Sequence, residues 1–180
     1  MRVSKTELED AFIIEPSVHG DERGFFFEGF SKTRLAEATG CKFEVAQVNH
    51  SRSTKHILRG LHYQVENVQA KLVWVTFGAI YDVIVDLRRS SSSFSHWQGF
   101  TLTAENKQRL LVPEGFAHGF LILSQAAEIT YVTSDIYNPE GERFLRWDCP
   151  KIGIEWPIKT PRLNHRDANA PGFDDCEKYR

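Results

Sequence analysis

The chain is poor in cysteine and has no excess of positive charge. Its three cysteines, Cys41, Cys149 and Cys176, are far apart in the sequence and form no pair with the spacing of metal ligands. Isolated thiols are typical of a reducing compartment, so we expect a cytoplasmic protein. The formal net charge of -2 provides no basic surface, and we expect no nucleic-acid partner.

Long apolar runs are also missing. No run approaches the length of a membrane span, and the first residues, Met1 to Lys5, lack the apolar segment of a secretory signal, so we expect no membrane association. A hydrophobic fraction of 41% with 12% aromatics indicates a folded globular chain. The 180 residues are enough for one domain with its own core, so we predict a single domain over residues 1–180.

Short β-rich segments separated by glycine-containing turns follow one another along most of the chain. The expected strands cover residues 25–28, 41–49, 58–64, 71–77, 80–87, 110–113, 116–123 and 127–133. Ser31 predicts the N-cap of a helix that runs through Ala38 and ends at Gly40. The pattern predicts an all-β fold, an antiparallel sandwich or jelly roll with one or two short helices, and an irregular tail from residue 150.

The segment Leu58 to Gln64 contains the first candidate for chemistry. Alternation on a strand predicts that Leu58, Gly60, His62 and Gln64 share a face, where the missing side chain of Gly60 leaves room for a ligand. A half-buried histidine bonded to a backbone carbonyl is the alternative. Strict alternation places Arg59 on the opposite face, so either Gly60 lies in a bulge or Arg59 reaches round an edge.

Other expected strands also carry polar residues where a sandwich has its mouth. These residues are Gln47, Asn49, His118 and Tyr131. One such residue can belong to a structural network, but polar groups on every one of these strands favour a polar ligand site.

A metal site is a weaker hypothesis. The run Pro113 to His118 matches the second half of the cupin metal motif, but Gln64 stands where the first half needs an imidazole. A neutral carboxamide is a poor ligand for a transition metal. We therefore expect no metal and no other cofactor, with a metal-dependent cupin as the alternative.

A set of short motifs occurs in a fixed order along nearly the whole chain. They are Gly20-Asp21-x-Arg23-Gly24-x-Phe26-x-Glu28, Gln47-x-Asn49-x-Ser51, Leu58 to Gln64, Ala70-Lys71, Gly78-x-Ile80-x-Asp82-Val83, Val85 to Arg88, Pro113 to Phe120, Tyr137-x-Pro139, Trp156-Pro157 and Arg166-Asp167. This ordered set resembles the dTDP-4-dehydrorhamnose 3,5-epimerase family. The resemblance implies a cupin jelly roll that epimerises C3 and C5 of dTDP-4-dehydro-6-deoxy-D-glucose, next to its C4 ketone.

The resemblance also implies a role for each site residue. His62 is the base, Asp167 orients its imidazole, Tyr131 is the proton donor and Lys71 stabilises the enolate. The implied substrate-binding residues are Arg23, Glu28, Gln47, Asn49, Arg59, His118, Glu142 and Arg166. A solvated surface carboxylate remains the alternative for Glu28 and for Glu142.

Three adjacent phenylalanines, Phe25 to Phe27, are too apolar for a solvent edge. The family resemblance points the same way, so we expect a homodimer in which this strand crosses to the neighbour.

Two other functions stay open, a non-catalytic sugar-binding cupin and an epimerase that inverts only C3 or only C5. An acid–base set of His62, Asp167, Tyr131 and Lys71 speaks against a simple binder.

Overall fold

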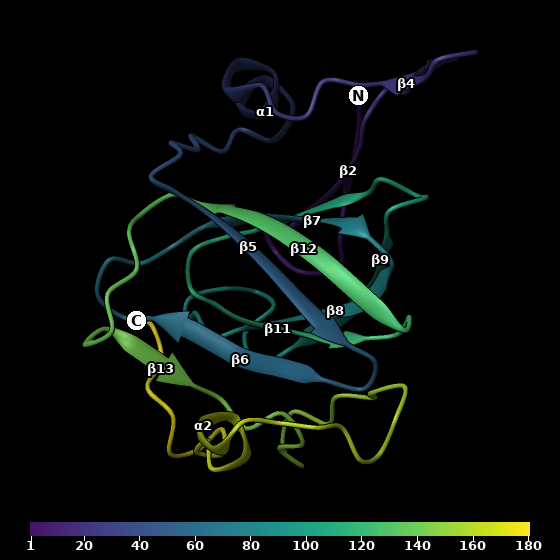
Figure 1. Cartoon of the computed structure of the whole chain (residues 1–180). Coiled ribbons are helices and arrows are strands. Elements are labelled where there is room, and N and C mark those ends of the chain that lie inside the picture. Colours follow the sequence, from purple (N-terminus) through teal and green to yellow (C-terminus); the bar gives the residue numbers. More distant parts are fainter.

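Two antiparallel sheets lie face to face in the computed structural model, which describes all 180 residues (Figure 1). The six-stranded sheet has the order β1 (Arg2–Lys5), β2 (Phe12–Glu15), β10 (Arg109–Val112), β7 (Lys71–Phe77), β12 (Ala126–Thr133) and β5 (Gln47–Thr54). The five-stranded sheet has the order β13 (Glu142–Phe144), β6 (Leu58–Gln64), β11 (Phe116–Ile122), β8 (Ala79–Asp86) and β9 (Trp97–Thr103). A separate hairpin, β3 (His19–Asp21) and β4 (Gly24–Phe26), extends from the body, and the helices are α1 (Lys32–Thr39) and α2 (His165–Ala168). The expected β-sandwich of the jelly-roll type is confirmed.

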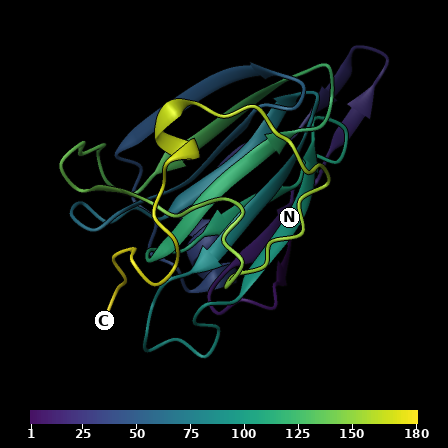
Figure 2. The ribbon, with the colours of Figure 1, turned by 90° about the horizontal axis from the view of Figure 1, so that it is seen from below.

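Three apolar clusters hold the layers together. The central cluster lies between the sheets and includes Val73, Ile84 and Ile129. On the outer face of the six-stranded sheet, Leu35 of α1 and Phe43 pack in a second cluster. The third covers the outer face of the five-stranded sheet, where the C-terminal segment runs across the strands (Figure 2). Burial of the outer faces explains why a strand such as β10 is apolar on both sides, with Leu110 and Val112 in the central cluster and Leu111 in the outer one.

Several expected elements are confirmed with small shifts at their ends. β7 has the predicted bounds, and α1 begins after the N-cap Ser31, whose side chain accepts a hydrogen bond from the Arg34 amide. Gly40 closes this helix with φ +76°, a left-handed conformation that glycine adopts without strain. In β8, Asp82, Ile84 and Asp86 share one side, as period-two alternation predicts, and the structure shows that this side faces the other sheet.

Other expectations were wrong or incomplete. The strand expected over residues 41–49 begins only at Gln47, because Phe43 packs against α1 instead of joining the sheet. β1, β3, β9 and β13 were not predicted. The tail contains α2, whose N-cap Asn164 accepts a hydrogen bond from the Asp167 amide at 2.8 Å.

A β-bulge in β6 decides which side chains face the space between the sheets. His62 lies opposite His118 and Arg59 opposite Phe120, so three steps along β6 match two along β11. Residues directly opposite each other share a face, so the bulge puts Arg59 on the same face as His62. The prediction that Leu58 shares the face of His62 was wrong, and of the two explanations for Arg59 the bulge is confirmed.

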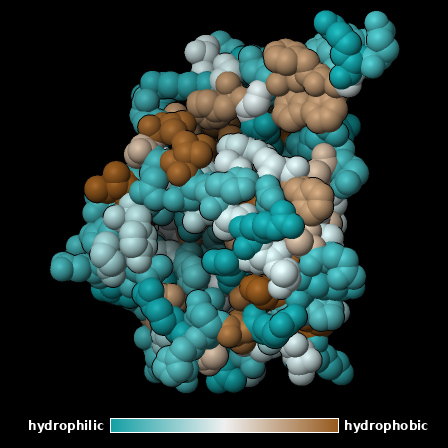
Figure 3. Space-filling model, in the orientation of Figure 1, coloured by the Kyte–Doolittle hydropathy of each residue, from teal (hydrophilic) through white to brown (hydrophobic).

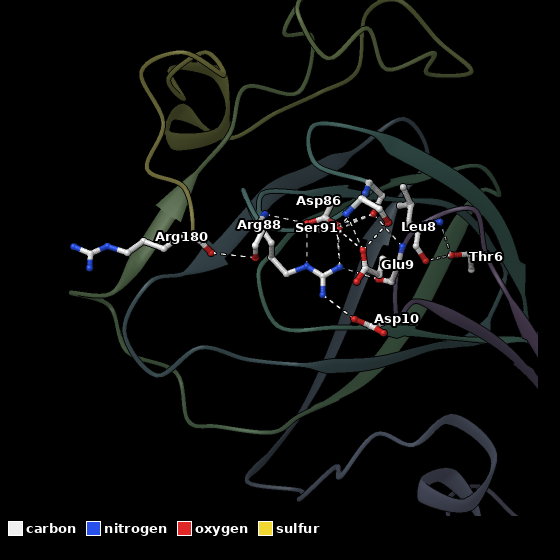
Figure 4. Close-up of polar contacts among 11 residues, drawn as sticks. Thr6, Leu8, Glu9, Asp10, Asp86, Arg88, Ser91 and Arg180 are labelled. Atoms are coloured by element: carbon white, nitrogen blue, oxygen red, sulfur yellow. Dashed lines mark hydrogen bonds and ion pairs between the residues drawn. The ribbon is translucent and has the colours of Figure 1, made fainter.

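A polar network fixes the loop after β8 (Figure 4). The buried Asp86 carboxylate accepts hydrogen bonds from Arg88 Nε at 3.0 Å and from Ser93 Oγ at 2.7 Å, and Arg88 also pairs with Asp10 at 3.0 Å. Burial raises the pKa of Asp86, but the bonds from Arg88, Ser91 and Ser93 together hold it below its usual value.

No helix of the structure has the length and apolar character needed to cross a membrane.

Candidate active site

Two adjoining cavities of about 220 and 120 Å³ lie between the sheets, and His62, Lys71 and Tyr131 line both of them. β6 supplies one wall, and β5, β7 and β12 supply the other. In Figure 3 this part of the surface, between β5 and β6, is hollowed and has a mostly hydrophilic rim. The structure therefore brings the predicted polar residues of several strands into one place.

His62 and Asp167 form a pair across 105 residues of sequence. His62 Nε2 lies 2.6 Å from Asp167 Oδ1, and the other carboxylate oxygen accepts the Gly60 amide at 3.2 Å. Asp167 has a side-chain exposure of 1%, whereas that of His62 is 32%. Because its Nε2 is engaged, the imidazole has its Nδ1 free to take a proton. Phe144 meets the ring edge-to-face, with centroids 5.1 Å apart, and fixes its tilt.

Tyr131 faces His62 from the other sheet. Its strand, β12, lies between β5 and β7 in the six-stranded sheet. The shared cavity therefore has a titratable side chain on each side, His62 from one sheet and Tyr131 from the other. The chain offers its phenol hydroxyl no hydrogen-bond partner, so the hydroxyl is available to a ligand. Burial raises the pKa of Tyr131, against the lowering effect of Arg59, and the phenol keeps its proton at neutral pH.

Lys71 provides a cation inside the same cavity. The residue is only 9% exposed, and no carboxylate pairs with its ammonium. Burial lowers its pKa to about 8, against the upward effects of Asp82 and Glu142. A desolvated cation of this kind interacts strongly with negative charge that develops beside it.

Arg59 and His118 complete the inner cavity. Arg59 Nε donates to Ser53 Oγ at 3.0 Å, which leaves both terminal nitrogens of the guanidinium for a ligand. His118 is nearly buried, and its Nε2 lies 3.0 Å from Asp82 Oδ1.

The outer cavity has amide and carboxylate groups on its rim. Gln47 Nε2 donates to Asn49 Oδ1 at 2.7 Å, and Gln47 Oε1 accepts the Tyr137 amide at 2.9 Å. Glu142 accepts the Tyr137 hydroxyl at 3.0 Å and also pairs with Arg166. Glu142 is therefore a lining residue with two partners, while Arg166 lies behind it with its guanidinium 4.5 Å from the Phe144 ring.

Gln64 has a structural role at the base of this cavity. Its Nε2 donates to the Asn67 carbonyl at 2.6 Å and to the Ile136 carbonyl at 3.2 Å, and its Oε1 accepts the Asn138 amide at 2.9 Å. Both ends of the amide thus hold two loops together. No group of three or more His, Cys, Asp or Glu side chains is placed to hold a metal.

Two of the expected substrate-binding residues lie away from the cavity of their own chain. Arg23 is at the tip of the hairpin, where its Nε donates to Asp21 at 3.1 Å. Glu28 follows the hairpin and pairs with Arg34 at 3.1 Å. Their contact with substrate remains a prediction.

Sequence reasoning did not assign Ser51, Gln69 or Tyr137 to the site, although all three line the cavities. Ser51 continues the alternation of Gln47 and Asn49, so period two along β5 was the available signal. Its hydroxyl is buried without a partner. Gln69 and Tyr137 lie in loops, where alternation predicts nothing.

Comparison with known proteins identifies the family. A sequence profile described as dTDP-4-dehydrorhamnose 3,5-epimerase matches residues 5–175. The dTDP-4-dehydrorhamnose 3,5-epimerase of Shigella flexneri is 49% identical over 180 residues, with 99% of each chain covered. The crystal structure of the enzyme of that name from Elizabethkingia anophelis superposes with a TM-score of 0.94 at 42% identity, covering 97% of each chain. A structure of the Legionella pneumophila dTDP-6-deoxy-D-glucose-3,5-epimerase in complex with dTDP-4-keto-L-rhamnose gives 0.95 at 40% identity, covering 99% of this chain and 98% of that one. Similarity of this extent in both sequence and structure means that the chain belongs to the dTDP-4-dehydrorhamnose 3,5-epimerase family.

Proposed function

We propose that this protein epimerises dTDP-4-dehydro-6-deoxy-D-glucose at C3 and C5 and forms dTDP-4-dehydro-L-rhamnose. One observation carries the proposal: a base, His62, and an acid, Tyr131, face one cavity from opposite sheets. Inversion of a carbon next to a ketone requires removal of a proton from one face and delivery of another to the opposite face.

The residues supply each step of this exchange. His62 Nδ1 takes the proton from the carbon, and the electron pair of the C–H bond moves to the C4 oxygen as an enolate. The Asp167 carboxylate stabilises the imidazolium that forms. Tyr131 then gives its proton to the carbon from the other side and the ketone re-forms. The phenolate recovers a proton from solvent and the His62 imidazolium releases its proton to solvent, so both groups return to their starting states.

The enolate oxygen needs positive charge close to it. Lys71 supplies an ammonium with no competing carboxylate in contact, and His118 lines the same cavity. A fixed cation at such an oxygen contributes several kcal/mol to the transition state.

The diphosphate and the nucleoside are assigned to the outer part of the site. Arg59 offers a guanidinium fork for phosphate oxygens, and Gln47, Asn49 and Glu142 offer the polar contacts beyond it. Arg166 holds Glu142 in place.

The active form is a homodimer in which the hairpin β3–β4 reaches the partner. Phe25 and Phe26 are 64% and 72% exposed, although apolar rings of this size are normally covered. In Figure 1 the hairpin projects from the body, so Arg23 and Glu28 are free to complete the site of a neighbouring subunit.

The enzyme works in the cytoplasm without a metal. Its three cysteines are unpaired thiols, and Cys149 and Cys176 pack as small apolar groups in the outer cluster. A metal-dependent cupin is disfavoured because Gln64 stands at the expected ligand position. Both ends of its side-chain amide are hydrogen-bonded to backbone groups.

Incubation with dTDP-4-dehydro-6-deoxy-D-glucose in deuterated water tests the proposal. We expect deuterium at both C3 and C5 and a product with both centres inverted. Label at C3 alone after long incubation would identify a 3-epimerase, and binding of the nucleotide sugar without any label would identify a sugar-binding protein.

A further inference from the structure

Asp82 is a carboxylate with no exposed surface at the back of the cavity, and none of the steps above uses it. It points inward from β8 between Ile80 and Ile84, both of which belong to the central apolar cluster. A buried carboxylate in such surroundings is costly unless it has a partner. The presence of a carboxylate at this buried position therefore requires an explanation, either in stability or in function.

Its partner is a single nitrogen that belongs to the site. His118 Nε2 lies 3.0 Å from Asp82 Oδ1 and 3.1 Å from Oδ2, and no other side chain bonds to this carboxylate. His118 Nδ1 has no partner in the chain and is left for a ligand in the cavity. Asp82 thus fixes the ring of His118 much as Asp167 fixes that of His62.

Burial lowers the pKa of Lys71, the one ammonium of the cavity, and the negative charge of Asp82 raises it. β7 and β8 lie in opposite sheets, and Lys71 of β7 has no carboxylate in direct contact. From β9, Phe100 is opposite Asp82 and brings no charge. The other titratable groups around this space are Arg59, His62 and Tyr63 from β6, His118 from β11, Tyr131 from β12, Glu142 from β13 and Tyr137 from the loop before β13. Asp167 lies behind His62 and is bonded to it. Glu142 already forms an ion pair with Arg166 and accepts a hydrogen bond from the Tyr137 hydroxyl. Asp82 is then the carboxylate best placed to balance Lys71.

We infer that Asp82 is a positioning residue of this enzyme, which orients His118 and supplies the negative charge that keeps Lys71 an ammonium. Its part in the reaction rests on the proposed function, whereas its effect on Lys71 does not. Asp82 touches no substrate and acts through these two neighbours.

The test compares Asp82→Asn with Asp86→Asn, two equally buried carboxylates of the same strand. An asparagine at 82 keeps an oxygen that accepts the proton of His118 Nε2 but removes the charge. We expect kcat/KM of Asp82→Asn to fall at least about tenfold, with its alkaline limb moved to lower pH by about one unit, since Lys71 loses its proton earlier. Asp86→Asn breaks the network of Figure 4, so its Tm falls while its pH profile stays that of the wild type. An unchanged limb in Asp82→Asn, or an equal shift in Asp86→Asn, would overturn the inference.

A measurement without substrate separates this inference from the proposed function. In protein labelled with ¹³C at lysine Cε, the Lys71 signal should titrate near pH 8 in the wild type and at lower pH in Asp82→Asn. Identical titration in the two proteins would refute the role of Asp82 even if the enzyme is fully active, and a shift would support it even if this sugar is not the substrate. The wild type alone gives a second check: ¹⁵N spectra should place the proton of neutral His118 on Nε2, and a proton on Nδ1 would contradict the pairing with Asp82.

Discussion

At the scale of single residues, the proposed mechanism makes the rate depend on the pairing of His62 with Asp167. Replacement Asp167→Asn keeps a hydrogen-bond acceptor for the imidazole but cannot stabilise its cation. We expect kcat to fall by about 10²–10⁴-fold while the fold is retained. Single-turnover kinetics and a circular dichroism spectrum check both parts, and His62→Asn should be at least as slow. Near-normal turnover of His62→Asn would mean that another group is the base.

The proposed role of Tyr131 as the proton donor predicts that its removal affects only one half of the reaction. Tyr131→Phe removes only the hydroxyl, so abstraction by His62 should continue while delivery from the opposite face fails. We expect deuterium wash-in to persist and the doubly inverted product to fall sharply, because water replaces the phenol at one carbon better than at the other. Mass spectrometry of the recovered sugar measures the first quantity and NMR the second. A variant that forms this product at the normal rate would exclude Tyr131 as the donor.

The proposed role of Lys71 predicts the alkaline side of the pH profile. Burial lowers its pKa from the ordinary lysine value to about 8, and only the protonated form stabilises an enolate. The rate should therefore be sustained below pH 8 and decline above it. The dependence of kcat/KM on pH measures this limb, and Lys71→Met should lose most activity at every pH. A profile that stays flat to pH 10 would show that the ammonium is not required.

At the scale of elements, the bulge in β6 makes a specific demand on Gly60. This residue has φ +122°, and a Cβ atom there would lie 2.5 Å from the Gly119 Cα. Gly60→Ala should therefore lower the free energy of unfolding by about 2–3 kcal/mol and reduce activity, because the bulge aims both Arg59 and His62. Gly172→Ala is a matched control, since its Cβ would meet nothing within 4 Å. Urea denaturation of both variants makes the comparison, and equal stability would contradict the assignment.

Strands β6, β7 and β8 show which structural features sequence patterns can predict and which they cannot. Lys71–Phe77 is predictable because β-formers fill it and Gly78 ends it, and the two sides of β8 follow from period two. The bulge depends on how closely Gly60 approaches Gly119 on another strand, which no local pattern encodes. His62 and Asp167 are likewise too far apart in sequence for spacing to pair them. That pairing came from the ordered family motifs, as did the roles of Tyr131 and Lys71.

At the scale of the whole molecule, the proposed dimer predicts that assembly and activity depend on the same hairpin. The protein should sediment as a dimer at micromolar concentration. Phe26→Ser should weaken the dimer and lower activity in parallel, because Arg23 and Glu28 then no longer reach a neighbouring site. Phe77→Ser serves as control, since Phe77 is also half exposed but lies on the sheet and not on the hairpin. A fully active monomer would refute the crossing of the hairpin.

A second prediction for the whole molecule is that its activity requires no metal. Extensive chelation should leave the rate unchanged, since the proton transfers are assigned to side chains and Gln64 is occupied by backbone groups. Elemental analysis of the active protein is the control. A stoichiometric metal that restores a dead apo-protein would contradict this expectation.

The position of Asp167, on a four-residue helix near the end of the chain, has a consequence for synthesis. All strands of both sheets precede residue 145, so the sandwich has its full set of strands while the ribosome still has the last fifth of the protein to make. At that moment His62 is in its strand without the carboxylate that supports it. If His62 is the base, as proposed, a nascent or prematurely terminated chain with every strand of the sandwich is therefore expected to be unable to take a proton from the sugar.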